Sequence, residues 1–110
     1  MPSIARAITQ FTEREIRALF EAARRVVKTP AFEIRKATTT NPHGRILIVI
    51  PRLVGTAPER NRIRRQLKAL FYQEKYFEKQ QDVIVLVRRG AADATYQDLH
   101  DLLQQAFSAR

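Results

Sequence analysis

Two apolar runs, ILIVI at residues 46–50 and VIVLV at residues 83–87, limit what this chain can fold into. Both are rich in β-branched residues and neither alternates with polar residues, which is typical of strands that are covered on both faces or central in a sheet. A long helical pattern separates the two runs. Strands and helices that alternate in this way predict an α/β fold.

Three segments have the spacing of amphipathic helices, at residues 12–25, 56–71 and 95–107. Each begins with a threonine that is followed three positions later by Glu or Asp, the pattern of a capping box. The apolar residues of each then recur at helical intervals along one face. The first helix is expected to end near Arg24 or Arg25, and the second is expected to be finished by packing of Tyr72, Tyr76 and Phe77.

Residues 31–38 alternate between apolar and charged side chains, which predicts a half-buried strand. Residues 41–44, Asn-Pro-His-Gly, have the composition of a type I turn, so the run at 46–50 is expected to return as the second strand of an antiparallel hairpin. The expected architecture is a two-layer α/β domain with a central sheet of about four strands packed by three helices. With 110 residues and 45% hydrophobic composition, residues 1–110 are expected to form a single domain.

The chain carries 20 Lys and Arg residues against 11 Asp and Glu residues, a formal charge of +9. So basic a protein favours an extended polyanion as its partner, with nucleic acid the first candidate and an anionic membrane the second. The absence of cysteine excludes disulfides, thiolate zinc sites and cysteine nucleophiles. No segment has the apolar length of a membrane span or of a signal peptide, so a cytoplasmic location is expected.

The second helical segment holds an unusual concentration of cations. At about 100° per residue, four of its side chains fall together on the side away from the apolar stripe, with Arg62 flanking them and Arg60 near the start of the helix. These four are Asn61, Arg64, Arg65 and Lys68. Guanidinium groups bind phosphate oxygens through a planar fork of donors and also stack on bases, so clustered arginine on a rigid helix suits a folded RNA better than clustered lysine would. No DNA partner is expected.

The sequence offers little for catalysis by the protein itself. Its two histidines, His43 and His100, do not have the spacing of a metal site, and no neighbouring carboxylates can be assembled into a two-metal nuclease centre. We therefore expect no catalytic residue and no metal site made by the protein alone.

A longer pattern surrounds the cluster. Val-Gly-Thr-Ala at residues 54–57 follows an apolar strand and leads into Arg-Asn-Arg-Ile-Arg-Arg at 60–65, Leu67-Lys68 and Phe71. Asp-Val-Ile-Val at 82–85 and Arg88 come later. In these motifs and in the order of its elements, nearly the whole chain resembles the bacterial ribonuclease P protein subunit.

This resemblance implies a small RNA-binding subunit that assists a catalytic RNA in removing the 5′ leader from precursor tRNA. The RNA and its bound Mg²⁺ would perform the hydrolysis, and the protein would act as a monomer in the holoenzyme. The implied fold is similar to the second domain of ribosomal protein S5, in the order α-β-β-(β)-α-β-α, with a left-handed β-α-β crossover around the basic helix.

The resemblance also assigns roles to residues. The implied contacts with the RNA subunit are Arg52, Arg60, Asn61, Arg62, Arg64, Arg65 and Lys68. The implied lining of a cleft for the single-stranded leader is Phe20, Phe32 and Arg88. Pro51 and Leu53 depart from the family pattern, which usually has Ser and Lys at these places.

Two other functions remain open from sequence. A structural RNA-binding protein of the ribosomal type would have the same composition, but it would be indifferent to the leader of a precursor tRNA. A basic module bound to an anionic membrane or an acidic protein would need a helix with a large unburied apolar face. The apolar faces of the helices in this chain are instead expected to be buried in its own core.

Overall fold

A computed structural model describes residues 3–108 of the chain. Its helices and strands, in chain order, are α1 (Ile4–Ala7), α2 (Glu13–Ala22), β1 (Arg24–Lys28), β2 (Phe32–Thr38), β3 (Ile46–Val49), α3 (Ala57–Gln73), β4 (Gln81–Val87) and α4 (Tyr96–Ser108). Three short 3-10 helices lie in the connections, η1 (Arg52–Val54), η2 (Tyr76–Lys79) and η3 (Ala91–Asp93). The three helices expected from the sequence are α2, α3 and α4, and the order of elements implied by the family resemblance is found, preceded by the additional helix α1. The residue pattern itself did not locate β1.

The strands form one four-stranded sheet in the order β1-β2-β4-β3. β2 is antiparallel to both of its neighbours, and β3 is parallel to β4, to which α3 connects it. The expected α/β class and the number of strands are confirmed. The predicted hairpin between residues 31–38 and 46–50 is wrong, because β4 lies between the corresponding strands β2 and β3.

The reason for this error lies in the burial of β4. Val83, Ile84 and Val85 are fully buried, so both faces of β4 are covered and the strand takes a central place. β3 is instead an edge strand, with residues 47–49 half-buried. The expectation of a strand that is central or covered on both faces is therefore right for residues 83–87 and wrong for residues 46–50.

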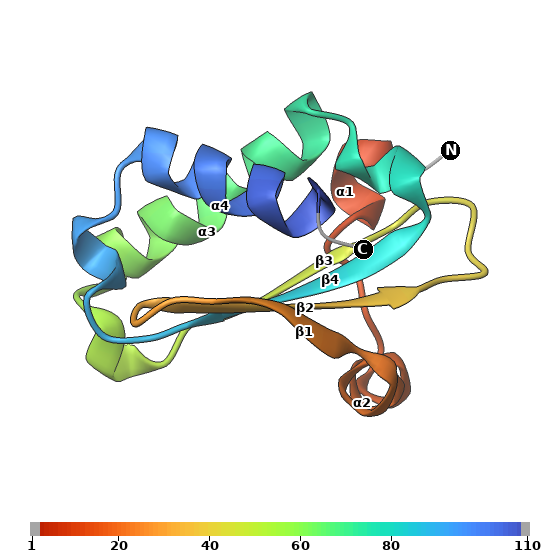
Figure 1. The fold of residues 1–110 in the computed structure, drawn as a ribbon, viewed down its shortest axis with the longest axis horizontal. Coiled ribbons are helices and arrows are strands. Elements are labelled where there is room, and N and C mark those ends of the chain that lie inside the picture. The colour runs from red at the N-terminus through yellow and green to blue at the C-terminus, as the bar shows by residue number, and fades with distance from the viewer. Residues whose placement is uncertain (1–2, 109–110) are drawn as a thin grey trace.

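The two faces of the sheet are covered unequally, as Figure 1 shows. α3 and α4 lie side by side over one face, and α2 lies against the other face near one end of the sheet. The main apolar core fills the layer between the sheet and the helix pair. Its largest fully buried members include Phe71, Ile34, Ile63, Leu67, Leu99 and Leu103. Much of the opposite face is left without a covering helix, and we call it the open face.

α2 is shorter than its apolar pattern suggested. It ends at Ala22, Ala23 is extended, and Arg24 already begins β1, so the expected end near Arg24 or Arg25 is wrong. Arg24 pairs with Lys36 of β2 across the antiparallel ladder. The local sequence pattern continues the helix into this segment, but long-range backbone hydrogen bonds to β2 make it a strand.

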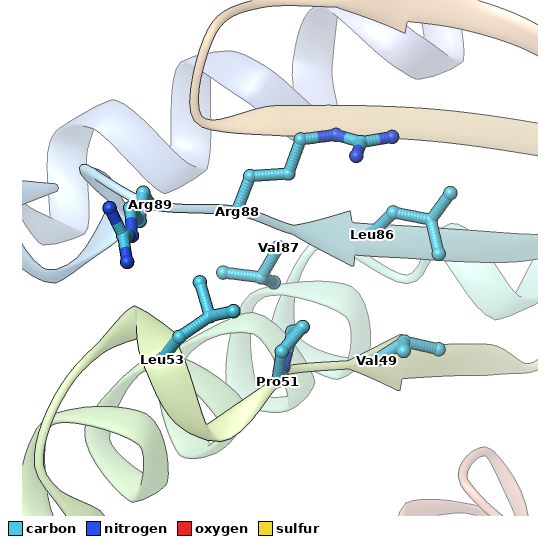
Figure 2. Close-up of a pocket in the computed structure, with 7 residues that line it drawn as sticks. All are labelled: Val49, Pro51, Leu53, Leu86, Val87, Arg88 and Arg89. Carbon is cyan, nitrogen blue, oxygen red and sulfur yellow. The ribbon is translucent and has the colours of Figure 1, made fainter.

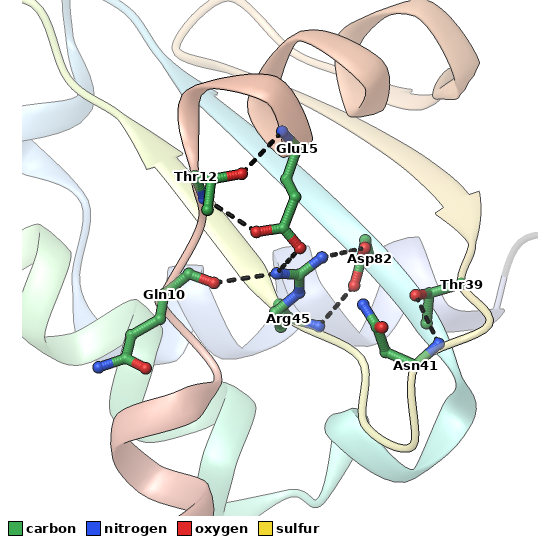
Figure 3. A network of polar contacts seen from close by, with 7 residues as sticks. All are labelled: Gln10, Thr12, Glu15, Thr39, Asn41, Arg45 and Asp82. Atoms are coloured by element: carbon green, nitrogen blue, oxygen red, sulfur yellow. Dashed lines mark hydrogen bonds and ion pairs between the residues drawn. The ribbon is translucent and has the colours of Figure 1, made fainter.

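Arg45 fastens α2 to the sheet, as Figure 3 shows. Its guanidinium donates to Glu15 Oε2 at 2.7 Å, to the Gln10 carbonyl at 3.0 Å and to Asp82 Oδ2 at 3.4 Å. It also stacks over the Phe11 ring, 4.3 Å from its centroid. Glu15 closes the capping box of α2 as well, so one buried cation links the start of this helix to β4.

Candidate RNA-binding surface

The orientation of α3 is set at its start and along its buried side. Thr56 Oγ1 accepts from the Glu59 backbone N–H, and Glu59 Oε1 accepts from the Thr56 N–H at 2.8 Å, which completes the expected capping box. The Thr56 amide also holds the pKa of the Glu59 carboxyl below its usual value. The apolar stripe of α3 is buried, and it consists of Ile63, Leu67, Leu70 and Phe71. The opposite side of the helix therefore faces solvent.

That outward side carries the cluster predicted from the sequence, which we call the basic face: Asn61, Arg64, Arg65 and Lys68. Asn61, Arg64 and Arg65 are exposed, and Lys68 is half-buried. Arg64 Nη1 donates to Asn61 Oδ1 at 3.3 Å. Within residues 3–108, none of these cations forms an ion pair with an acid. The positive charge of the basic face is consequently not neutralised by the protein.

Two neighbouring arginines have a different arrangement. Arg60 Nη1 donates to the carbonyls of Gly55, at 2.8 Å, and of Arg52, at 3.2 Å, which ties the η1 turn to α3. Arg62 donates to the carbonyls of Ala92 and Ala94, at 2.8 and 3.0 Å, in the loop that precedes α4. Arg62 also reaches Gln66 Oε1 at 3.0 Å. Both guanidinium groups thus fix backbone segments beside the basic face.

The open face of the sheet carries alternate residues of β2 and β4. Ala37 and Asp82 lie beside Leu19 of α2 in a shared pocket, so they point toward α2. Because side chains alternate along a strand, Glu33 and Arg35 of β2 point to the same side. The residues of β4 on this side are Ile84 and Leu86, followed by Arg88 after the strand.

A pocket of about 340 Å³ lies at one end of the open face, where β3 and β4 end. Figure 2 shows Pro51 and Leu53 on one side of it and Val87, Arg88 and Arg89 on the other. Pro51 and Leu53 are among the residues expected to depart from the family pattern, and they make this wall apolar. The pocket therefore combines an apolar wall with two guanidinium groups.

Glu33 organises the cations of the open face. Its side chain is 3% exposed, and its two oxygens accept from Arg35 Nε at 2.6 Å and from Arg88 Nη2 at 3.1 Å. The hydrogen bond from Arg35 is the main reason why the pKa of the Glu33 carboxyl is lowered, and Arg88 contributes to the same effect. One carboxylate thus holds two guanidinium groups over the sheet, with a net positive charge.

Comparison with known proteins identifies the family. The sequence profile of the family described as Ribonuclease P matches residues 9–109. The chain belongs to the ribonuclease P protein family. Proteins named ribonuclease P protein component from two strains of Streptococcus thermophilus are each 30% identical to it over 91 residues, which is 83% of this chain and 81% of theirs.

Solved structures agree on the fold. The ribonuclease P protein of Staphylococcus aureus superposes with a TM-score of 0.78 at 20% identity, covering 92% of this chain and 93% of that one. The corresponding protein of Thermotoga maritima gives a TM-score of 0.76 at 18% identity, covering 93% and 97%. The α/β architecture described above is therefore the fold of the ribonuclease P protein family.

One residue that the family resemblance placed in the leader cleft lies elsewhere. Phe32 is 6% exposed and belongs to the main core, so its assignment to the cleft is corrected here. The cause is the alternation of β2, which puts Phe32 and Ile34 on the side of α4 and Glu33 on the open face. Phe20 is 36% exposed on α2, and its role in the cleft stays a prediction.

Of the three aromatic residues expected to finish the packing of α3, one differs from expectation. Phe77 is buried and Tyr76 packs against the core, as expected of residues that finish the packing of the helix. Tyr72 is 43% exposed instead. Sequence analysis missed it, although the signal was present, because Tyr72 follows Lys68 by four residues and so continues the basic face.

Among residues 3–108, no three Asp, Glu or His side chains are grouped so that they could hold a metal ion. In the same part of the chain, no helix has the length and apolar character needed to cross a membrane.

The Glu33 network predicts a specific dependence of stability on pH. The pKa of the Glu33 carboxyl is lowered in the folded state, so the ionised carboxylate stabilises the fold. This contribution to the free energy of unfolding is complete when the pH is above the ordinary pKa of 4.5, and it is lost as the pH falls through the folded-state pKa. Glu33→Gln is expected to lower the free energy of unfolding at pH 7 by about 1–2 kcal/mol, since Arg35 and Arg88 are partly exposed. Urea unfolding between pH 7 and pH 3 should show the difference from wild type shrinking below pH 4.5. A constant difference would contradict this role of Glu33.

Proposed function

We propose that this chain is the RNA-binding protein component of ribonuclease P, and that it assists a catalytic RNA in removing the 5′ leader from precursor tRNA. The protein would bind the RNA subunit as a monomer and would itself contribute no catalytic residue. Its cysteine-free, basic composition suits the reducing cytoplasm, where we place it.

The observation that carries this proposal is the basic face. Arg64, Arg65 and Lys68 lie on a rigid helix whose opposite side is buried, and no acid within residues 3–108 pairs with them. Mutual repulsion of these cations is relieved when phosphates bind between them. Membership of the ribonuclease P protein family supports an RNA subunit as the source of those phosphates. Arg52 is exposed in η1 at the start of this surface and extends it.

Arg60 and Arg62 would contribute in a second way. Their guanidinium groups fix the η1 turn and the loop before α4, so they keep the surroundings of the basic face in place. A guanidinium has five N–H donors, and those that remain are available to RNA.

The open face is the proposed site of the single-stranded leader. Arg88 and Arg35 supply positive charge there, the pocket beside Leu53 supplies apolar surface, and Phe20 on α2 supplies an exposed ring. Electropositive grooves with aromatic and apolar faces are well suited to unpaired RNA.

Mg²⁺ is assigned in this proposal to the RNA subunit. The described residues gather no ligand set for it, and Mg²⁺ at phosphates keeps several of its waters and takes few protein ligands. The protein would act on Mg²⁺ only indirectly, by neutralising phosphate repulsion.

The test is processing of precursor tRNA by the cognate RNA subunit, with and without the protein, at Mg²⁺ concentrations too low for the RNA alone. We expect the protein to restore cleavage at the 5′ end of the mature tRNA. We also expect the reconstituted complex to bind precursor tRNA more tightly than mature tRNA, with affinity that rises with leader length until the open face is filled. No gain in cleavage would reject the function, and equal affinity for both tRNAs would favour a structural RNA-binding protein of the ribosomal type.

A further inference from the structure

Tyr72 continues the basic face with an aromatic ring. It lies four residues after Lys68 and seven after Arg65, so at 100° per residue it falls within about 40° of both around the axis of α3. Its side chain is 43% exposed. An exposed ring in line with a row of unpaired cations needs an explanation that packing of the core does not supply.

A second aromatic ring packs against one face of Tyr72. The Tyr72 ring stacks on Phe77 with a centroid distance of 5.7 Å and an angle of 22° between the rings. Phe77 is 7% exposed and is in turn met edge-on by His43 at 6.0 Å. One face of the Tyr72 ring is therefore backed by a buried aromatic, while the residue as a whole remains 43% exposed. Within residues 3–108 the Tyr72 hydroxyl makes no hydrogen bond.

The chain after α3 keeps this pair together. Lys75 has a left-handed backbone conformation, with φ of 55°, which reverses the chain directly after the helix. The reversal starts the 3-10 helix η2 and brings Phe77 back under Tyr72. The position of the ring is thus fixed before any ligand binds, which reduces the conformational entropy lost on binding.

We propose that Tyr72 is a stacking platform for an unpaired base of the RNA subunit, whose neighbouring phosphates are bound by Lys68 and Arg65. This inference rests on the proposed function for the identity of the RNA. Tyr72 lies one helical turn from Lys68, about 6 Å along the axis, so a single nucleotide and its phosphate can engage both side chains. Stacking on an aromatic ring accepts every base, because each has a π face.

The surroundings of Tyr72 favour RNA over a membrane or an apolar partner. Among residues 3–108, the exposed large apolar or aromatic side chains are Phe20, Leu53, Tyr72 and Tyr96, and each lies on a different element. A single ring flanked by cations does not form the wide apolar surface that membrane insertion needs.

The test compares variants in binding to the cognate RNA subunit alone, over a series of salt concentrations. Tyr72→Ala is expected to weaken binding about 5- to 150-fold without changing the salt dependence, because stacking releases no counterions. Tyr72→Phe should bind like wild type. The matched control is Tyr96→Ala: Tyr96 is 42% exposed, but it lies on α4 and donates a hydrogen bond to Gln73. This control should also bind like wild type.

A spectroscopic variant separates stacking from a purely structural role. The chain contains no tryptophan, so Tyr72→Trp introduces a single fluorophore at this position. Its emission should be quenched when the RNA subunit binds, with affinity retained. Normal affinity of Tyr72→Ala, or unquenched emission of the bound Tyr72→Trp variant, would overturn the inference while leaving the proposed function intact. A loss of affinity confined to precursor tRNA would overturn it as well, because the base would then come from the leader. Failure of the wild-type protein to bind the RNA subunit would instead reject the proposed function itself.

Discussion

Replacing Arg45 with alanine is expected to lower the free energy of unfolding by about 3 kcal/mol, the largest loss of stability that we expect from a single substitution outside the main core. The Arg45 side chain is 14% exposed and that of Asp82 is 9% exposed. Without the guanidinium, the Arg45 backbone N–H, at 2.8 Å, is the one hydrogen-bond donor to the Asp82 carboxylate that remains among residues 3–108. A buried carboxylate deprived of its cation is strongly destabilising.

The charge state of Asp82 supports this expectation. Burial already raises the pKa of its carboxyl above the usual value, although Arg45 acts in the opposite direction. In Arg45→Ala the raised pKa is no longer opposed, so the folded protein is expected to take up a proton on Asp82 at a higher pH. Its stability relative to wild type should therefore recover partly as the pH is lowered toward 5.

Urea unfolding followed by circular dichroism measures the effect. Arg45→Lys is the matched control, because it keeps the charge but loses the planar fork that reaches Glu15, Gln10 and Asp82 together, and it should lie between wild type and Arg45→Ala. In the double variant Arg45→Ala with Asp82→Asn, the loss should be smaller than the sum of the single losses. A loss below about 1 kcal/mol in Arg45→Ala would show that the network does not fasten α2.

The same variant connects stability with the proposed function. Arg45 holds the start of α2, and α2 carries the exposed Phe20, for which we propose a contact with the leader. At a temperature low enough for the Arg45→Ala variant to stay folded, its affinity for precursor tRNA is therefore expected to depend less on leader length than that of the wild type. Its affinity for the RNA subunit should be retained, because the basic face lies on α3, across the sheet.

These expectations depend on features that sequence analysis predicted to different degrees. The start of α3 was predicted within one residue, because a capping box and a helical apolar stripe are local signals. The residue pattern did not place β1 at Arg24–Lys28, because the segment RRVVK becomes a strand only through pairing with β2. The false hairpin has a related cause, since the place of β4 beside β2 is decided by packing between segments more than 40 residues apart in sequence.

The same limit applies to the predicted site. Helical geometry was sufficient to place Arg64 and Arg65 on an outward face. It was not sufficient for Arg62, because the carbonyls that hold its guanidinium belong to Ala92 and Ala94, about 30 residues away. Charge and periodicity therefore identify a candidate surface, whereas the structure decides which cations on it have no protein partner.

The basic face makes the second large prediction. The double variant Arg64→Ala with Arg65→Ala is expected to lose two phosphate contacts, each of which contributes about 0.7 to 0.9 to the slope of log K against log salt concentration. The slope should therefore fall by about 1.4 to 1.8. If the loss is purely one of counterion release, the affinity for the RNA subunit falls about 25- to 60-fold at 0.1 M salt and hardly at all near 1 M.

A matched pair of cations on another element controls for net charge. Arg14 and Arg17 are exposed on α2, so Arg14→Ala with Arg17→Ala removes the same charge from the opposite side of the sheet. This control should leave the slope for the RNA subunit unchanged. Neither double variant should lose much stability, because among residues 3–108 the exposed hydrogen bond from Arg64 to Asn61 is the one side-chain hydrogen bond or ion pair removed. Equal slopes for the two double variants would mean that net charge alone attracts the RNA and that α3 is not its docking surface. A fall confined to Arg64→Ala with Arg65→Ala would locate the phosphates on the basic face, where within residues 3–108 no acid pairs with the cations.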